Sequence, residues 1–533
     1  MIMSKGNPIF RSWAPEWLTR LTIFLVMFPT VMLFALSTAN ISAATGFYGV
    51  EPADIQFSML LYYAALASFT PLERRFFSRV STKEYFLICL VLQVLISYAC
   101  YNTRSLTVLF AGRFLQGMVN CGVTSICLTL LFGRLKSEHA RETGYAIFYT
   151  MILCSASLTS LVTAPLVDNF EYNVLYKMII YTFVPGGILL LLLMNKVHLV
   201  RKTPLYQLDW ASFFLYSPML ILIGYVVTYG QQYYWLQDDS IVWSLIAIVL
   251  LAIVFVTRQL TRKRPFIHQE VFQSRAFLFG IFLIGMLYLI RGAFSITTSY
   301  FSTVLGMDPI NLYELLIYNI AGIIIGAVIS GRLIVKKRPL QFIWLAGFFL
   351  LLLFHGGMYF LFASEADMNT FILPLLLQGM GAGMVFTPIL LFTISSVPTE
   401  LSQSAAAVGV FIRFAFFGIS TALINYFSLF YSGTHAMRLS DHVSRADNGL
   451  QERLHLYESA LHARGMEPDM AGRAATGLLN KAIQKQAFLK YAMDYNEMVV
   501  ILILGLMLLI IMAPFINRTI IDVKAKQPAA ATF

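Results

Sequence analysis

Long apolar stretches separated by short polar ones recur along almost the whole chain. A helix needs roughly 20 mostly apolar residues to cross a bilayer core, and fourteen stretches meet this requirement. They predict membrane-spanning helices, because in lipid each backbone polar group must be paired within its own segment. The short alternating strands of a membrane β-barrel do not occur in the sequence. The predicted spans are 19–42, 53–73, 84–101, 106–130, 143–166, 173–195, 209–229, 240–258, 275–300, 312–335, 341–363, 370–396, 404–430 and 497–518.

Composition supports a chain that is embedded in a bilayer. Hydrophobic residues make up 58% of the sequence and charged residues 12%, whereas soluble proteins carry roughly 25% charged residues. So few charges cannot cover the surface of a soluble protein. The predicted fold class is therefore an all-α polytopic membrane protein.

The loops between the predicted spans alternate in charge. Arginine and lysine gather in every second loop except 397–403, which has neither, and the loops between them carry mainly aspartate and glutamate. The positive-inside rule places the basic loops in the cytoplasm. Both termini, 1–18 and 519–533, are then cytoplasmic, and the chain is a multi-pass protein of the cytoplasmic (inner) membrane. The net charge of +11 thus indicates orientation, and nucleic-acid binding is disfavoured because the cations are spread over many loops.

The chain also repeats itself at an offset of about 260 residues. Gly49–Pro52 follows the first span as Gly306–Pro309 follows the ninth, and Leu115–Met118 in the fourth span matches Leu377–Met380 in the twelfth. A basic loop follows both the second and the tenth span. Chance similarity in an apolar chain is the alternative, but matches in the same order at nearly the same offset favour an internal repeat.

An internal repeat predicts two six-helix bundles, one at 19–195 and one at 275–430 with 497–518. The spans within 209–258 are then an inserted pair, and 431–496 is a long hydrophilic segment outside the cytoplasm. Parallel repeats of this kind are a design of secondary transporters, whose substrate site lies near the midplane between the halves. The sequence therefore predicts a small-molecule transporter in which the two bundles rock against each other.

Several motifs resemble the major facilitator superfamily, and most closely its fourteen-span drug:proton antiporter family of EmrB/QacA type. Ala111–Gly117 is similar to the Arg-x-x-Gln-Gly signature of the fourth span, and Gln378–Gly383 is similar to the twelfth. Asp209–Trp210 and Gly230–Gln231 resemble the two ends of the inserted seventh span, and the polar segment 451–494 resembles the family's long outer loop.

The resemblance implies a proton-driven antiporter that exports amphiphilic drugs or lipid-like or anionic small molecules. It implies a transport or coupling role for Arg113, Gln116 and Gly117, with the proton gradient as the energy source and no cofactor. It also implies a periplasmic adaptor (membrane fusion) protein and an outer-membrane channel as partners. The antiporter signature of the fifth span is reduced to 164–167, which leaves uptake or another solute as an alternative.

Three arginines fall inside predicted spans, and each should face a wet cavity or a partner, because burying a charge at mid-membrane costs about 2.5–3.5 kcal/mol. Arg113 shares one helical face with Asn120, and an interhelical polar clamp is the alternative to a role in the cavity. Arg291, one turn from Tyr288, is expected to face the substrate or else to bond neighbouring carbonyls. Arg413 matches a family arginine, with a snorkel toward the cytoplasmic interface as the alternative.

Carboxylates are scarce in the spans. Exporters of cationic drugs commonly carry an acidic residue in the first span, where this sequence has Asn40, and no Asp or Glu falls clearly at mid-span. A cavity with arginines and no carboxylate disfavours cations, so anionic, zwitterionic or neutral amphiphiles are expected. The residues predicted to line the cavity are Asn40, Asn120, Tyr288 and Gln378.

Proton coupling requires a titratable group, and four acidic residues near span ends are candidates: Glu73, Asp209, Glu314 and Asp494. A polytopic enzyme is disfavoured, because no cluster of Asp, Glu, His or Cys gathers at one membrane face. The five cysteines all fall within spans and show no metal or redox spacing. Neither a catalytic residue nor a metal is predicted.

The hydrophilic segment 431–496 is predicted to form a helical hairpin outside the membrane. Leu454, Tyr457 and Leu461 keep helical spacing, Gly465 suits a helix end, and Pro468 suits the first turn of a second helix that runs into the last span. This hairpin is expected to dock the adaptor protein, with a lid or a passive cap as the alternative.

Overall fold

The computed structural model describes residues 9–77, 80–134, 140–198, 209–262, 264–441 and 448–513. Within these ranges the chain is helical, and its sole extended pairing is an isolated bridge between Phe10 and Met194. Fourteen of the described helical segments are long and apolar enough to cross a membrane, so the predicted fold class is confirmed. The predicted cytoplasmic tail and the end of the last predicted span, residues 514–518, lie outside the described residues.

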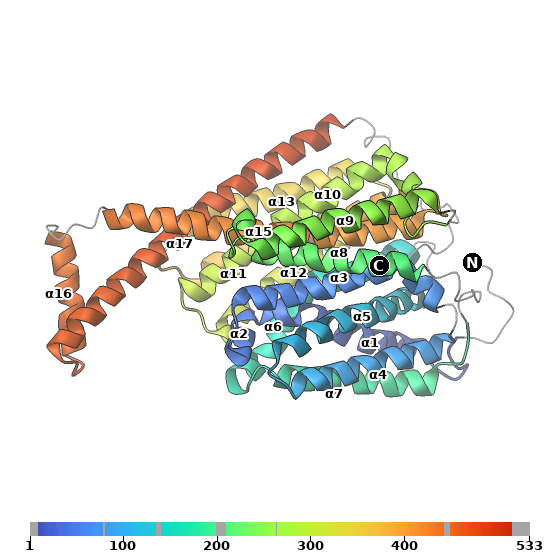
Figure 1. The fold of residues 1–533 in the computed structure, drawn as a ribbon, viewed down its shortest axis with the longest axis horizontal. Coiled ribbons are helices and arrows are strands. Elements are labelled where there is room, and N and C mark those ends of the chain that lie inside the picture. The colour runs from blue at the N-terminus through green and yellow to red at the C-terminus, as the bar shows by residue number, and fades with distance from the viewer. Residues whose placement is uncertain are drawn as a thin grey trace.

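The helices form two side-by-side bundles with an inserted pair along them (Figure 1). The N-terminal bundle contains α1 (Glu16–Ala39), α2 (Ile41–Tyr48), α3 (Pro52–Phe77), α4 (Thr82–Tyr101), α5 (Leu106–Arg134), α6 (Ala140–Asn169) and α7 (Val174–Leu193). The inserted pair is α8 (Trp210–Tyr229) and α9 (Asp239–Thr261). The C-terminal bundle contains α10 (Arg275–Gly292), α11 (Phe294–Thr303), α12 (Pro309–Val335), α13 (Leu340–Leu361), α14 (Ile372–Ser395), α15 (Ser402–Asp441) and α17 (Pro468–Met512). Short 3-10 turns lie at Trp235–Gln237, Gln269–Gln273 and Met368–Phe371, and α16 (Asn448–His462) precedes α17.

The first span of each bundle is broken in the same way. Asn40 separates α1 from α2, and Ala293 separates α10 from α11. Each broken span ends in a loop whose glycine, Gly49 or Gly306, has a φ of +65°, a conformation that favours glycine. The sequence predicted continuous helices at 19–42 and 275–300. Gly292 lies next to the second break, but no glycine or proline lies next to Asn40 at the first. Discontinuous spans are common around transporter binding sites.

The same helix pairs meet in both halves. In the N-terminal bundle α1 packs on α6, α3 on α5, and α4 on both α5 and α7. In the C-terminal bundle α10 packs on α15, α12 on α14, and α13 on both α14 and α17. The two bundles are therefore built alike, as the internal repeat requires.

Glycines bring the equivalent pairs α3–α5 and α12–α14 into backbone contact. A Cβ atom on Gly117 would collide with the carbonyl oxygen of Tyr62, and one on Gly379 would collide with that of Asn319. In lipid, where apolar side chains gain little from association, such close approach supplies much of the packing between helices. The matched sequence motifs around Gly117 and Gly379 are thus packing motifs in the structure.

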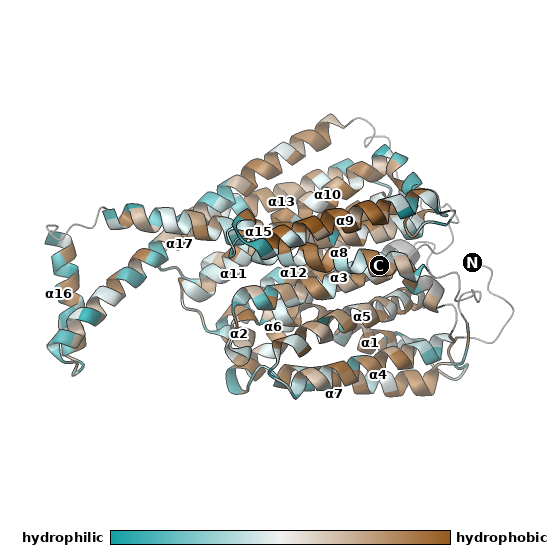
Figure 2. Cartoon of the chain, viewed as in Figure 1, coloured by the Kyte–Doolittle hydropathy of each residue, from teal (hydrophilic) through white to brown (hydrophobic). Residues whose placement is uncertain are grey.

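The inserted pair bridges the two bundles on one side. Helix α8 contacts both α3 and α15, whereas α9 packs mainly on α8. Much of α9 is therefore exposed, and Figure 2 shows it as a strongly hydrophobic rod. Exposed apolar side chains on α9, such as Trp243 and Ile253, are suited to contact with lipid.

Two helices extend far beyond the membrane-spanning layer (Figure 1). Helices α15 and α17 contain 40 and 45 residues, about 60 and 68 Å at 1.5 Å per residue, against a bilayer core of about 30 Å. The predicted boundaries at 430 and 497 do not appear as breaks, because both helices continue and stay paired there. Tyr491 Oη donates to the Ile424 carbonyl (3.1 Å), and His435 meets Asp494 at 2.7 Å. We call residues 431–441 and 448–495 the protrusion.

The tip of the protrusion follows the predicted helical hairpin in part. Helix α16 ends at His462, Gly465 has a φ of +88°, and Pro468 lies in the first turn of α17. Residues 442–447 lie outside the described residues. We call the end of the molecule that carries the protrusion the protrusion end. The opposite end, where α1 begins, is called the basic end.

Gly379→Val tests the close α12–α14 contact. Overpacking of this kind costs about 1–3 kcal/mol, so the thermal unfolding midpoint of the purified protein should fall by several degrees. Gly505→Val is the matched control, because a Cβ atom on Gly505 meets nothing within 4 Å. Equal midpoints for the two variants would contradict the packing role of Gly379.

Candidate functional site

Aromatic side chains from both bundles meet at the centre of the molecule. The hydroxyl groups of Tyr63 on α3 and Tyr288 on α10 form a hydrogen bond of 2.9 Å between the bundles. Tyr149 on α6 packs on Phe386 of α14 with ring centroids 5.5 Å apart. Tyr63 also contacts Phe417 of α15, at 5.8 Å. We call this region, together with the arginines that it contains, the central seam.

Arg291 lies in the central seam, at the end of α10. Its guanidinium carbon is 5.8 Å from the centre of the Phe386 ring. The side chains of Tyr63, Tyr288 and Cys154 are near enough to interact with it electrostatically. These neighbours belong to both bundles, so the side chain faces the interface between them. The predicted bond to neighbouring carbonyls is not among the hydrogen bonds of the described residues, and the Arg291 Nε atom is buried without a partner.

Arg413 lies in the same seam but is held by its own helix. Its Nε atom donates to the Gly409 carbonyl at 3.2 Å. The side chains of Tyr63, Tyr149 and Tyr288 are near enough to interact with it electrostatically. The side chain is 5% exposed, so it does not reach out to the membrane interface as the snorkel alternative required. Arg413 is therefore part of the inner wall of the seam.

Arg113 lies away from the seam, inside the N-terminal bundle. It is completely buried, and it donates to Ser37 Oγ (3.0 Å), the Leu33 carbonyl (2.8 Å) and Gln116 Oε1 (3.4 Å). Its guanidinium carbon is 5.7 Å from the Tyr62 ring centre. These contacts join α5 to α1 and α3. They are the interhelical clamp that the sequence pattern left open, and they differ from the expected cavity-lining role.

Four other residues with predicted site roles also bond between neighbouring helices. Gln116 Nε2 donates to Ser97 (3.3 Å), and Asn120 donates to the Tyr62 hydroxyl. Asn40 accepts from Thr163 on α6 (3.0 Å). Gln378 accepts from Asn319 on α12. All four bond to a helix of their own bundle, whereas Tyr288 bonds to Tyr63 of the other bundle, so the structure places Tyr288, and not these four, in the central seam.

Asp209 caps the amino-terminal end of α8, at the basic end. It accepts from Ser212 and forms an ion pair with Arg258 of α9 at 2.6 Å. Burial alone would raise the pKa of Asp209, but the hydrogen bonds from Arg258 and Ser212 outweigh it and hold the pKa below its usual range. Asp209 therefore stays ionised near neutral pH. Its ion pair with Arg258 links α8 to α9, and a carboxylate that stays ionised is a poor proton carrier.

Glu73 differs from the other candidate carboxylates. Glu314 is exposed, and Asp494 is paired with His435 in the protrusion. Glu73 is 3% exposed and is the one buried Asp or Glu side chain in the described part of the chain. Ser125 on α5 donates to its Oε2 at 2.9 Å.

His355 is a further buried titratable residue, and no sequence motif marks it. It lies on α13 and contacts Asn496 of α17 through Nδ1, at 2.7 Å. A lone histidine in an apolar helix carries no motif, so only the three-dimensional contact identifies it. Within the described residues, no three His, Cys, Asp or Glu side chains are grouped to hold a metal ion.

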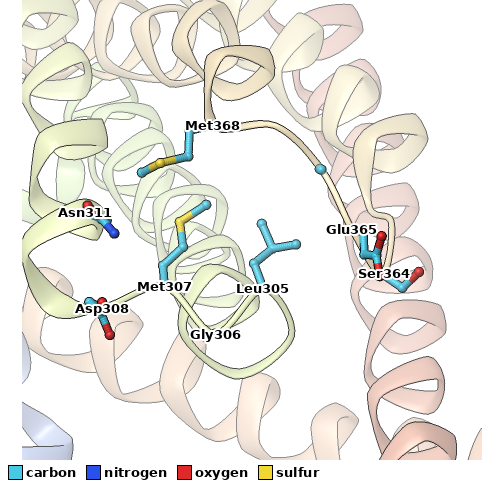
Figure 3. A pocket seen from close by; sticks show the side chains of 9 residues that line it. Leu305, Gly306, Met307, Asp308, Asn311, Ser364, Glu365 and Met368 are labelled. Carbon is cyan, nitrogen blue, oxygen red and sulfur yellow. The ribbon is translucent and has the colours of Figure 1, made fainter.

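A hollow of about 340 Å³ opens at the protrusion end, away from the seam. It lies between the α11–α12 loop and the loop after α13 (Figure 3), where Asp308, Asn311, Glu365 and Met368 line it. Its position at the helix ends and its acidic lining distinguish it from the arginine-containing seam. We assign it no part in transport.

Comparison with known proteins defines the class of this chain. The Major Facilitator Superfamily model matches residues 22–422. The chain is 20% identical to the fatty acid resistance protein FarB of Neisseria gonorrhoeae, over 96% of this chain and 97% of that protein. It is 20% identical to the multidrug export protein EmrB of Escherichia coli K12, over 76% and 78% respectively. The match to the colistin resistance protein EmrB of Acinetobacter baumannii, 23% identical, covers 39% of this chain and 41% of that protein.

Solved structures show the same fold. A POT family transporter crystallised with 5-aminolevulinic acid has a TM-score of 0.60 at 12% identity, over 96% of this chain and 99% of that one. The human organic anion transporter MFSD10 has a TM-score of 0.51 at 12% identity, over 92% and 100%. At such identities the likeness concerns the fold alone.

The chain belongs to the Major Facilitator Superfamily, which confirms the predicted resemblance. It is a multi-pass membrane transporter of small molecules and not an enzyme.

Arg113→Gln tests the interhelical clamp. The variant leaves the Leu33 carbonyl and Ser37 without a charged donor, and the loss of such bonds should cost at least about 2 kcal/mol. The thermal unfolding midpoint should therefore fall clearly, whereas Arg291→Gln should leave it nearly unchanged. An unchanged midpoint for Arg113→Gln, together with lost transport, would instead restore the predicted direct role of Arg113 in coupling.

Proposed function

We propose that this transporter exports amphiphilic compounds across the cytoplasmic membrane in exchange for protons. The names of its relatives, a multidrug export protein and a fatty acid resistance protein, support export of amphiphiles. The buried carboxyl group of Glu73 is the observation that carries proton coupling.

Glu73 is suited to carry a proton because of where it lies. Glu73 is the last residue of the apolar span within α3, at the basic end. A carboxyl group buried in a membrane helix bundle is costly to keep, and such groups commonly form proton relays in transporters. Glu73 lies on α3, and its polar neighbours are Tyr85 and Cys89 of α4 and Cys121 and Ser125 of α5. Since α3 also carries Tyr63 of the central seam, a change at Glu73 has a direct mechanical path to the interface between the bundles.

The orientation follows from the charges of the loops. The basic end carries Arg262, Lys336 and Arg338, whereas the protrusion end carries Asp238 and Asp308. The positive-inside rule then places the basic end and both termini in the cytoplasm. The protrusion accordingly lies on the outer side of the inner membrane.

The protrusion is proposed as the docking surface for a periplasmic adaptor protein, which in turn would join an outer-membrane channel. It reaches well beyond the bilayer, and its tip carries exposed apolar side chains such as Leu456 and Met470. A lid over the transport path would have to cover the interface between the two bundles at the protrusion end. The base of the protrusion contacts the C-terminal bundle, where Lys485 Nζ donates to the Val304 carbonyl (2.8 Å). Beyond this base, the protrusion points away from the bundles (Figure 1).

Glu73→Gln tests proton coupling. In proteoliposomes with an imposed pH gradient, uptake of ethidium, naphthalene-1-sulfonate and dodecanoate is measured for the wild type and the variant. Because glutamine cannot exchange a proton, the variant should lose gradient-driven accumulation by at least about tenfold and keep counterflow exchange of the same probe. Asp494→Asn, in the protrusion, is the matched carboxyl-to-amide control. Undiminished gradient-driven uptake by Glu73→Gln would rule out Glu73 as the proton carrier.

Single cysteines on the two faces test the orientation. The five native cysteines are buried, so Gln237→Cys and Arg262→Cys can be introduced without removing them. A membrane-impermeant maleimide should label position 237 in intact spheroplasts, and position 262 only after the membrane is permeabilised. Labelling of both positions from one side would refute the proposed orientation.

A further inference from the structure

The three arginines inside the spans differ in how many of their hydrogen bonds the protein satisfies. Arg113 donates to Ser37, the Leu33 carbonyl and Gln116. Arg413 donates to the Gly409 carbonyl. Arg291 donates to no described residue, and its Nε atom is buried without a partner. The side chain is partly exposed. A guanidinium group has five N–H donors, and the described residues accept a hydrogen bond from none of those of Arg291.

Within the described residues, no carboxylate is among the groups that interact with Arg291. The titratable groups that act on it are Tyr63, Tyr288 and Cys154, all neutral at physiological pH. The buried carboxylate of the described region, Glu73, packs instead on Ser125 inside the N-terminal bundle. A positive charge at this depth is costly unless something pairs with it. The natural complement is an anion that arrives from outside the protein.

The side chains around Arg291 provide the second half of a binding site. Phe386 stacks against its guanidinium group, and Tyr149 and Tyr288 pack around the same ring at 5.5 and 6.2 Å. Planar aromatic walls contact an apolar body well, and tyrosine hydroxyls can bond to a polar head. Charge, unsatisfied donors and apolar walls thus coincide at one place in the interface.

We propose that Arg291 is the head-group binding residue of the central seam, and that the seam takes organic oxyanions with an apolar or aromatic body. The guanidinium group pairs with the carboxylate or sulfonate of the ligand through parallel N–H···O bonds, the geometry for which arginine is best suited. The ligand body lies against Phe386 and the neighbouring tyrosines. Arg413, on the neighbouring helix α15 of the same bundle, adds positive potential and keeps its bond to the Gly409 carbonyl.

This inference names the substrate class of the site in the proposed function, and its test is independent of proton coupling. Binding is measured at equilibrium, without a membrane gradient, on the full chain in lipid nanodiscs. The probes are naphthalene-1-sulfonate and (1-naphthylmethyl)trimethylammonium, which share one ring system and carry opposite charges. Failure of the Glu73 experiment would refute coupling and leave this binding measurement intact.

The wild type should bind the sulfonate at least about tenfold more tightly than the ammonium probe. Arg291→Gln should weaken sulfonate binding by about ten- to a hundredfold, the range for loss of hydrogen bonds to a charged group, and should leave the ammonium probe unaffected. Arg291→Lys, which keeps the charge and loses the paired donors, should fall between the two. Arg262→Gln at the exposed basic end is the matched control and should bind as the wild type does.

Two results would overturn the proposal. One is equal affinity of the wild type for the two probes. The other is unchanged sulfonate binding by an Arg291→Gln variant that unfolds at the wild-type temperature. If Arg291→Gln unfolds early, Phe386→Leu serves as a second variant, because it removes the stacking ring without touching the charge. It should weaken both naphthyl probes equally, and a charge-dependent effect there would also contradict the assignment.

Discussion

The cost of keeping a guanidinium group inside a bilayer governs how this transporter is built. Each of the three arginines requires compensation, and the described protein groups supply it to different extents. Around Arg113 the compensation is internal, through Ser37, the Leu33 carbonyl and the face of Tyr62. Around Arg291 it is absent from the described protein groups. An arginine whose N–H groups are bonded by the protein stabilises a bundle. One whose N–H groups lack such partners can form those bonds with a ligand instead.

This contrast separates the rigid parts of the molecule from the part that must change. Within each bundle, glycines such as Gly117 and Gly379 bring helix backbones into contact, and buried amides join neighbouring helices. Such packing has few alternative arrangements, so each bundle is expected to move as a body. Between the bundles, the polar contacts are fewer and come from side-chain tips, among them the Tyr63–Tyr288 hydroxyl pair. Asn425 also donates to Gln56 (2.8 Å), and Gln403 donates to the Pro71 carbonyl (3.2 Å). Rocking therefore requires this small set of bonds between the bundles to be exchanged.

Much of this architecture could be predicted from the sequence. The thickness of the bilayer sets the length of each spanning helix, and the charge of each loop indicates the side of the membrane on which it lies. The glycines at 49 and 306 marked equivalent turns, and both have left-handed backbones. The roles of Asn40, Gln378 and Arg113 could not be predicted in the same way. Helical spacing shows which residues share a face, but it does not show whether that face meets another helix or a cavity. Arg291 and Arg113 looked alike for this reason, and only their partners in space tell them apart.

The position of Arg291 also connects ligand binding to the movement of the bundles. Tyr288 lies one turn before it on α10, and its hydroxyl group bonds to Tyr63 of the other bundle. An anion that pairs with Arg291 therefore lies beside a bond that must break when the bundles separate. A ligand can shift a conformational equilibrium only by its difference in affinity between the two states. Since Arg291 belongs to one bundle and Tyr63 to the other, an oxyanion that bonds to both is held most tightly when the seam is closed around it, and its departure favours opening.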